Sequence, residues 1–208
     1  MSNSRPPGIA FIVSAPSGAG KTTLCKMAVD FFQDLRHSIS YTTRQPRPGE
    51  INGVDYWFVD ERTFDNMIGN GEFLEYASVF GRRYGTSRID LERMLSGGLN
   101  VILDIDVQGA GNARKVLDNG VYIFILPPSV KACEERLKLR GKDDPEEIKK
   151  RLKIALDEIK QAPQYEYIII NDVLDNAFEK LKSIIISERS KSKIMMRSVS
   201  KIFGGVLD

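Results

Sequence analysis

The stretch IAFIVSAPSGAGKTT, residues 9–23, decides the fold. Residues 9–13 are apolar and partly β-branched, which is typical of a short buried strand. A glycine-rich turn follows, and a helical pattern then runs from about residue 21 to residue 35. A glycine-rich loop between a strand and a helix can turn its backbone N–H groups around a phosphate, and the helix N-terminus adds a positive dipole end. The stretch therefore predicts a phosphate-binding loop in an α/β core.

The loop follows the spacing Gly-x-x-x-x-Gly-Lys-Thr with one departure, because Ala15 stands where the first glycine is usual. Lys21 is expected to place its charge on the β and γ phosphates of ATP, and Thr22 to offer its hydroxyl to Mg²⁺. The candidate ATP-binding residues of the loop are Ala15, Pro16, Ser17, Gly18, Ala19, Gly20, Lys21, Thr22 and Thr23. The loop by itself indicates a nucleotide and leaves the reaction open.

The rest of the chain alternates between short apolar runs and helical patterns. Apolar runs occupy residues 100–104, 122–126 and 168–170, and helical patterns occupy residues 107–116, 129–139, 145–159 and 174–190. Continuous apolar strands separated by helices are typical of a parallel sheet covered by helices on both faces. The fold class predicted is therefore the α/β core of a phosphate-loop kinase.

The domain organisation predicted is a single domain with two additions to the core, which comprises about residues 8–37 and 87–190. Residues 38–86 break the alternation with β signals at 56–59 and 73–80 and a short helix at 60–70, capped by Asp60, so they form an inserted lobe. The polar break at residues 140–144 predicts a short lid at about 136–151. The basic tail, residues 191–208, predicts a frayed or disordered end, with an oligomer or nucleic-acid contact as the alternative.

Composition narrows the class of protein. The chain has 208 residues and a net charge of only +2, too small for a general nucleic-acid binder. The two cysteines have no metal-like or redox-like spacing, and one histidine cannot build a zinc site. The sequence has no apolar run of transmembrane length, and because residues 1–8 lack a basic stretch followed by a long apolar region, we expect no secretory signal. We therefore expect a cytoplasmic protein with no nucleic-acid or membrane partner, and the oligomeric state stays open.

A carboxylate ends the second apolar strand. Asp104 closes the run VILD, where folds of this class place an acidic group near the metal ion, and Asp106 could share the task. Asp104 and Thr22 are the candidate metal ligands.

The inserted lobe carries residues suited to a second nucleotide. Arg44 and Arg47 lie on a proline-bounded loop and can form forks around a phosphate dianion, to which Tyr56 and Tyr84 can add hydroxyl donors. Guanine presents two adjacent donors and the acceptor O6. A carboxylate such as Glu75 matches the donor pair, and hydroxyls such as those of Ser40 and Thr86 match O6.

The stretch TTRQPRPGEINGVDYWFV, residues 42–59, resembles the guanylate kinase signature, and the resemblance extends over about residues 8–190. It continues through FLEY (73–76), YGT (84–86), ILDIDVQG (102–109), PPS (127–129) and IND (170–172). The resemblance implies Mg²⁺-dependent transfer of a phosphoryl group from ATP to GMP, and to dGMP, in purine nucleotide metabolism. It implies that GMP is bound by Ser40, Arg44, Arg47, Tyr56, Glu75, Tyr84, Thr86 and Asp104.

The resemblance also assigns the donor side and the catalytic groups. Arg140, Asn171 and Asp172 would lie near the adenine, and the catalytic set would be Lys21, Arg44, Arg140, Arg151 and Asp104. Arg136 either joins the arginines near the phosphates or lies on a solvated helix face. Two alternatives stay open at this point: a peptide-binding module with the same fold, and a phosphate-loop enzyme that uses another acceptor.

Overall fold

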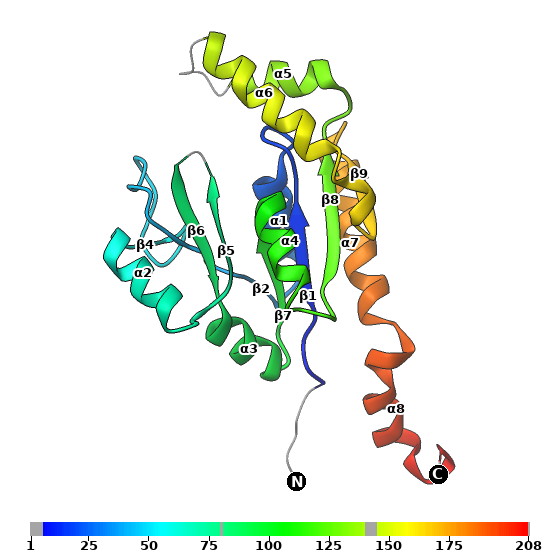
Figure 1. Cartoon of the computed structure of the whole chain (residues 1–208). Coiled ribbons are helices and arrows are strands. Elements are labelled where there is room, and N and C mark those ends of the chain that lie inside the picture. Colours follow the sequence, from blue (N-terminus) through cyan, green and yellow to red (C-terminus); the bar gives the residue numbers. More distant parts are fainter. Residues whose placement is uncertain (1–5, 80, 140–144, 208) are drawn as a thin grey trace.

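The structure is a computed structural model that describes residues 6–79, 81–139 and 145–207, and its centre is a five-stranded parallel sheet (Figure 1). Across the sheet the strands are β2 (Leu35–His37), β7 (Asn100–Asp104), β1 (Ala10–Ser14), β8 (Val121–Leu126) and β9 (Tyr167–Ile170). Strand β1 pairs in parallel with both β7 and β8, and its five residues are all buried. The central position of β1 carries the phosphate-binding loop to the middle of the sheet edge.

Helices cover both faces of this sheet, which confirms the predicted fold class. The core on one face joins alternate residues of β1 to α1 (Lys21–Phe31) and α7 (Leu174–Arg189). The core on the other face joins the intervening β1 residues to α3 (Arg88–Ser96) and α4 (Val107–Arg114). The short 3₁₀ helix η1 (Ala162–Gln164) precedes β9. Burial on both faces explains why the strands read as continuous apolar runs.

A second, four-stranded sheet lies beside the core (Figure 1). Its order is β4 (Trp57–Phe58), β3 (Tyr41–Thr42), β6 (Arg82–Ser87) and β5 (Phe73–Val79), with α2 (Glu61–Gly69) packed against it. The predicted cap of α2 is confirmed, because the Asp60 carboxylate accepts a hydrogen bond from the Thr63 N–H at 2.6 Å. This sheet comes from the stretch that the sequence predicts to be an inserted lobe.

Several elements differ from the expectations. Helix α1 ends at Phe31 instead of residue 35, because Phe32 takes an extended conformation and Leu35 pairs with Asn100 in β2. The sequence patterns do not predict strands β2, β3 and β6 or helix α3. The side chain of Ser87, the last residue of β6, caps α3, so strand and helix join without a loop that would separate their patterns.

Helices α5 (Val130–Leu139) and α6 (Pro145–Ile159) form a hairpin at the end of the sheet that carries the phosphate loop (Figure 1). The hairpin has a small core of its own, formed by Cys133, Leu137, Leu152 and Ala155. Residues 140–144, which include Arg140, lie outside the described residues. The hairpin spans the predicted lid.

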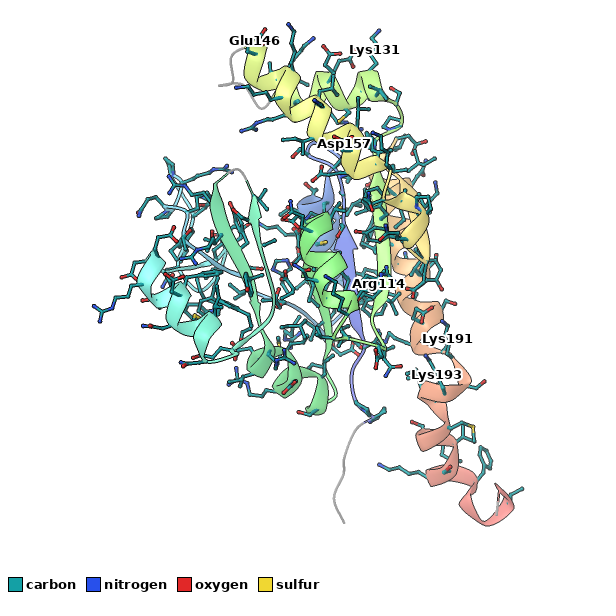
Figure 2. The ribbon with its side chains drawn as sticks, in the orientation of Figure 1. Arg114, Lys131, Glu146, Asp157, Lys191 and Lys193 are labelled. Atoms are coloured by element: carbon teal, nitrogen blue, oxygen red, sulfur yellow. The ribbon has the colours of Figure 1, made fainter. Side chains whose placement is uncertain are left out.

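The tail differs from the expectation of a frayed or disordered end. Residues Ser192–Leu207 form helix α8, which is kinked at Phe203 and extends away from the body of the molecule (Figure 1). Ile194 packs against the core, while Met195, Ile202 and Val206 are exposed. Lys191 and Lys193 lie where α7 passes into α8 (Figure 2). Within the described ranges, α8 and the other helices are too short or too polar to cross a membrane.

Candidate functional site

The phosphate loop follows β1 directly and ends at the first turn of α1. Its backbone takes left-handed conformations at Gly18, with φ 86°, and at Gly20, with φ 90°. Such φ values favour glycine because no Cβ is present to clash. Ala15, the departure from the usual pattern, is 7 % exposed and belongs to the core beside α1. The alanine therefore contributes to packing, and glycine is present at the two loop positions that have left-handed backbone conformations.

The loop is braced by the end of the sheet. The side-chain amide of Asn171, which follows β9, donates to the Ala19 carbonyl at 2.7 Å, and Asn171 is itself buried. Arg136 on α5 donates to the Asn171 carbonyl at 3.0 Å. The Arg136 side chain therefore lies partly buried against the end of the sheet instead of on a fully solvated helix face. Asp172 is exposed, and its carboxylate accepts from the Val173 N–H.

Replacing Gly20 with alanine is expected to destabilise the protein by about 2 kcal/mol or more. A Cβ at Gly20 would require a left-handed conformation that costs about 1–2 kcal/mol, and it would lie 2.4 Å from the Asn171 amide nitrogen. Chemical denaturation measures the loss. The matched control is Gly111→Ala in α4, where the added Cβ meets no atom within 4 Å and alanine should stabilise the helix by up to about 1 kcal/mol. Equal stabilities of the two variants would contradict the prediction.

Lys21 and Asp104 form a nearly buried ion pair at the base of the loop. The Lys21 ammonium lies 2.6 Å from the Asp104 carboxylate and donates to the Ile105 carbonyl at 2.7 Å. Burial alone would raise the pKa of Asp104, but the Lys21 charge outweighs burial and lowers it. Burial likewise opposes the charge on Lys21, and Asp104 raises the pKa of Lys21 despite it. Both groups are thus held charged.

Oxygen donors suited to Mg²⁺ meet at this pair. A hydrogen bond from Thr22 helps to lower the pKa of Asp104, so the hydroxyl and the carboxylate face one another. Both are hard oxygen ligands of the kind that Mg²⁺ binds together with phosphates and waters. Asp106 caps α4 by accepting from the Gly109 N–H at 2.7 Å. No cluster of three or more His, Cys, Asp or Glu side chains that could hold a metal alone is found in the described part of the chain.

Arg44 lies in the predicted loop of the second lobe, and an unpredicted partner, Glu50, holds its side chain. Both carboxylate oxygens of Glu50 accept from the Arg44 guanidinium, at 2.8 and 2.9 Å. Glu50 also accepts from the backbone N–H of Arg47 at 2.7 Å, while the Arg47 side chain is exposed. The Arg44 guanidinium carbon lies 5.3 Å from the centre of the Tyr56 ring. Glu50 therefore orients the arginine fork that the sequence predicts for a phosphate.

Two of the predicted phosphate donors lie side by side. The rings of Tyr56 and Tyr84 have their centres 5.9 Å apart. Burial raises the pKa of Tyr56, and the next contributions come from Asp104 and Lys21 of the core. Tyr56 therefore lies beside the arginine fork and within electrostatic reach of the ion pair at the base of the phosphate loop. Ser40 precedes β3, and its carbonyl accepts from the Trp57 N–H at 2.9 Å.

Glu75 and Thr86 meet across the paired strands β5 and β6. The Thr86 hydroxyl donates to the Glu75 carboxylate at 2.6 Å, and Glu75 is only 5 % exposed. The other carboxylate oxygen faces α4, since a Cβ at Gly109 would lie 2.7 Å from it. Burial raises the pKa of Glu75 to about 7, and the Asp106 carboxylate adds to the effect. The Glu75 carboxylate thus lies where the second lobe meets the core.

The structure brings the predicted residues together in three groups: Lys21 with Thr22 and Asp104, Arg44 with Tyr56 and Tyr84, and Glu75 with Thr86. Arg151 lies on α6 and is partly buried, and Arg140 falls outside the described residues. The contributions of Glu50 and Gly109 were not predicted from the sequence, although both residues lie in stretches that resemble the family, residues 42–59 and 102–109.

Comparison with known proteins identifies the family. The guanylate kinase family model matches residues 8–188. This chain belongs to the guanylate kinase family.

Relatives cover nearly the full length of the chain. The guanylate kinases of Geobacter sulfurreducens and Carboxydothermus hydrogenoformans are 50 % and 44 % identical to it, over 94 % and 97 % of this chain and 97 % and 98 % of theirs. The crystal structure of guanylate kinase from Anaplasma phagocytophilum superimposes with a TM-score of 0.78 at 31 % identity, over 99 % of this chain and all of that chain. The chain is thus a nucleoside monophosphate kinase of the guanylate kinase family, which transfers a phosphoryl group from ATP to GMP.

Proposed function

We propose that the chain performs this transfer with the phosphate loop as the donor site and the second lobe as the acceptor site. Residues 15–23 would bind the phosphates of ATP, with Asn171, Asp172 and Arg140 on the adenine side. Support comes from the left-handed backbone at Gly18 and Gly20 and from the brace that Asn171 gives to the loop. Loops of this shape direct N–H groups at an anion.

The acceptor phosphate is assigned to the arginine fork of the second lobe. Arg44, Arg47, Tyr56 and Tyr84 would bind the phosphate of GMP. The bidentate contact with Glu50 holds Arg44 in the geometry that a phosphate needs, and it lowers the cost of ordering the side chain when GMP binds. Asp104 and Lys21 lie within electrostatic reach of Tyr56, so the acceptor phosphate would lie next to the donor loop.

The choice of guanine is assigned to Glu75, and this buried carboxylate is the observation that carries the proposal. A carboxylate has about four lone pairs, and the Thr86 hydroxyl occupies one of them, so acceptors remain for the two adjacent donors of guanine. Ser40 and Thr86 would donate to O6, for which the Thr86 hydroxyl must turn from Glu75. Adenine presents the reversed pattern and would leave the carboxylate unpaired, which a buried site penalises strongly.

Transfer requires alignment and charge stabilisation, because the acceptor phosphate is already an anionic nucleophile. Lys21 would hold the β and γ phosphates, and Arg44, Arg140 and Arg151 would stabilise the charge that spreads over the transferred group. Thr22 and Asp104 would hold Mg²⁺, which when bound neutralises the charge on the phosphates. Asp104 must be ionised to bind the ion, and its lowered pKa favours the ionised form. Thr22 would bind through its neutral hydroxyl.

A panel of acceptors tests the assignment. We expect ADP release with GMP, slower or comparable release with dGMP, and at least about 10²-fold lower kcat/KM with AMP, UMP or TMP, because only guanine matches the buried carboxylate. A coupled assay of ADP release at saturating ATP measures each acceptor. Faster turnover with AMP or TMP than with GMP would overturn the assignment of Glu75, and loss of turnover on chelation of Mg²⁺ is expected in every case.

A further inference from the structure

Helix α8 extends away from the body of the molecule and exposes large apolar side chains (Figure 1). Ile202 is 71 % exposed and Val206 is 80 % exposed, and Met195 and Phe203 are exposed as well. Ile194, at the start of α8, packs against the core instead. Scattered apolar residues on a surface need no explanation, but several gathered on one exposed helix indicate a contact surface.

The apolar residues before the kink fall on one side of α8. Met195, Val199 and Ile202 are spaced by four and three residues, which places them on one face of an α-helix. Met196 lies three residues before Val199 and joins the same face. The apolar side is therefore wider than the two-position seam by which helices pair in a coiled coil.

The charge of this segment has one sign. Residues 190–207 contain four basic residues and no acidic residue. Two of the basic residues, Lys193 and Lys201, are exposed and lie eight residues apart, on one side of the helix. Glu188, beside the start of α8, is buried and already pairs with Lys191. The helix therefore presents positive charge next to its apolar side.

A helix with an apolar side and a basic side fits the surface of a membrane that contains anionic lipids. We propose that α8 binds such a surface, lying in the plane of the headgroups with its apolar side towards the acyl chains and its lysines beside the lipid phosphates. A helix of this kind lies on a membrane without crossing it, so it needs no transmembrane length. A second copy of the chain fits less well, because α8 offers no acidic residue to the lysines of a partner helix.

The position of α8 leaves the nucleotide sites open. A hollow at the start of α8 is lined by Lys193 together with Ile9, Val121 and Tyr167, which lie at the amino ends of β1, β8 and β9. The phosphate loop follows the carboxyl end of β1, at the opposite edge of the sheet (Figure 1). A membrane bound by α8 would face away from the phosphate loop, so turnover of GMP with ATP should not depend on it.

Flotation of the full chain with lipid vesicles tests the proposal. Vesicles of phosphatidylcholine mixed with phosphatidylglycerol are compared with vesicles of phosphatidylcholine alone. We expect at least about tenfold more binding to the anionic vesicles, since each lysine near such a surface strengthens binding about fivefold. Binding should fall at high salt, because salt screens the lysines from the lipid phosphates.

Two double variants separate the apolar side from the basic side. Ile202→Ser with Val206→Ser removes apolar area, and Lys193→Gln with Lys201→Gln removes charge. Each is expected to lower binding to the anionic vesicles about tenfold or more. All four residues are exposed, so both variants should be as stable as the parent, which thermal unfolding checks.

The matched controls change the same types of residue elsewhere on the surface. Ile89→Ser with Val116→Ser alters two exposed apolar residues, and Lys115→Gln with Lys131→Gln removes two exposed lysines. Lys131 lies at the end of the molecule opposite Lys193 (Figure 2). Both controls should bind the anionic vesicles as the parent does.

Four results would overturn the proposal. No binding to anionic vesicles, or equal binding to both kinds of vesicle, excludes recognition of an anionic surface. A parent dimer that binds no vesicles and dissociates in Ile202→Ser with Val206→Ser, as measured by sedimentation velocity, assigns the apolar side to a second copy of the chain. Loss of binding in the lysine variant alone, with none in the apolar variant, assigns α8 to polyanions in general.

Discussion

Replacing Lys21 with methionine is expected to lower kcat with ATP and GMP by about 10³-fold or more. Lys21 supplies the one protein cation of the phosphate loop, and charged donors directed at a developing negative charge are worth at least this factor when removed. Methionine has a similar length, so it fills the same space without the charge. Steady-state assay at saturating concentrations of both nucleotides measures kcat separately from binding. A loss below tenfold would contradict the proposed role.

The same variant should also lose stability, because it leaves the Asp104 carboxylate nearly buried without its cation. Lys21 now lowers the pKa of Asp104, and without it burial would raise that pKa above the value of the unfolded chain. A group with a raised pKa in the folded state costs stability above its unfolded pKa of 3.8, so the free energy of unfolding of the variant should fall as pH rises from about 4. The parent should show the opposite sign, losing stability as pH falls through the lowered pKa.

Two controls separate the lost charge from the lost fold. Lys21→Met combined with Asp104→Asn removes the unpaired carboxylate, so it should recover most of the stability and none of the activity. Lys26→Met changes a lysine on the same helix whose side chain is mostly exposed and lies 3.8 Å from Asp55. It should retain kcat within about twofold. Recovery of turnover in the double variant would show that Lys21 acts only by supporting the fold.

The core could be predicted from sequence because its signals are local. Residues 9–23 contain strand, turn and helix start in one continuous stretch, and strands β7, β8 and β9 are continuous apolar runs. Strand β2 has only three residues and is defined by its pairing with Asn100–Ile102, far along the chain, so no local pattern could reveal it. Strand β6, with the sequence RRYGTS, mixes charged, small and aromatic residues without alternation. It owes its place to pairing with β5.

The site was predicted by residue type, whereas its secondary contacts depended on tertiary structure. Arg44 and Glu75 could be proposed because a guanidinium and a carboxylate match a phosphate and a guanine edge. The pairing of Arg44 with Glu50 requires the turn of the loop between them, and the approach of Glu75 to Gly109 joins β5 to a helix in the other part of the chain.

Replacing Glu75 with glutamine is expected to lower kcat/KM for GMP by about 10²-fold and to leave KM for ATP within about twofold. A glutamine side chain offers one acceptor and one donor, so one of the two guanine donors would face another donor in a buried site. Leaving such a group unpaired costs about 1–3 kcal/mol, and the lost hydrogen bond to a charged group adds to it. The measurement is steady-state kinetics with each substrate varied in turn. Glu72→Gln, at the partly exposed residue that precedes β5, is the control and should match the parent.

The pH dependence of KM for GMP, compared between the parent and Glu75→Gln, shows whether the Glu75 carboxylate binds guanine. Glu75 must be ionised to accept both guanine donors, and its pKa is raised to about 7, so KM for GMP should rise in the parent as pH falls below 7. Glutamine does not titrate, and the variant should lack this rise. Since a raised pKa costs the folded state stability above the unfolded value of 4.5, Glu75→Gln should be at least as stable as the parent at pH 8, by up to about 3 kcal/mol. A variant that is both stable and unable to select GMP cannot be explained by misfolding, whereas a parent with no change in KM between pH 6 and pH 8 would remove Glu75 from the guanine site.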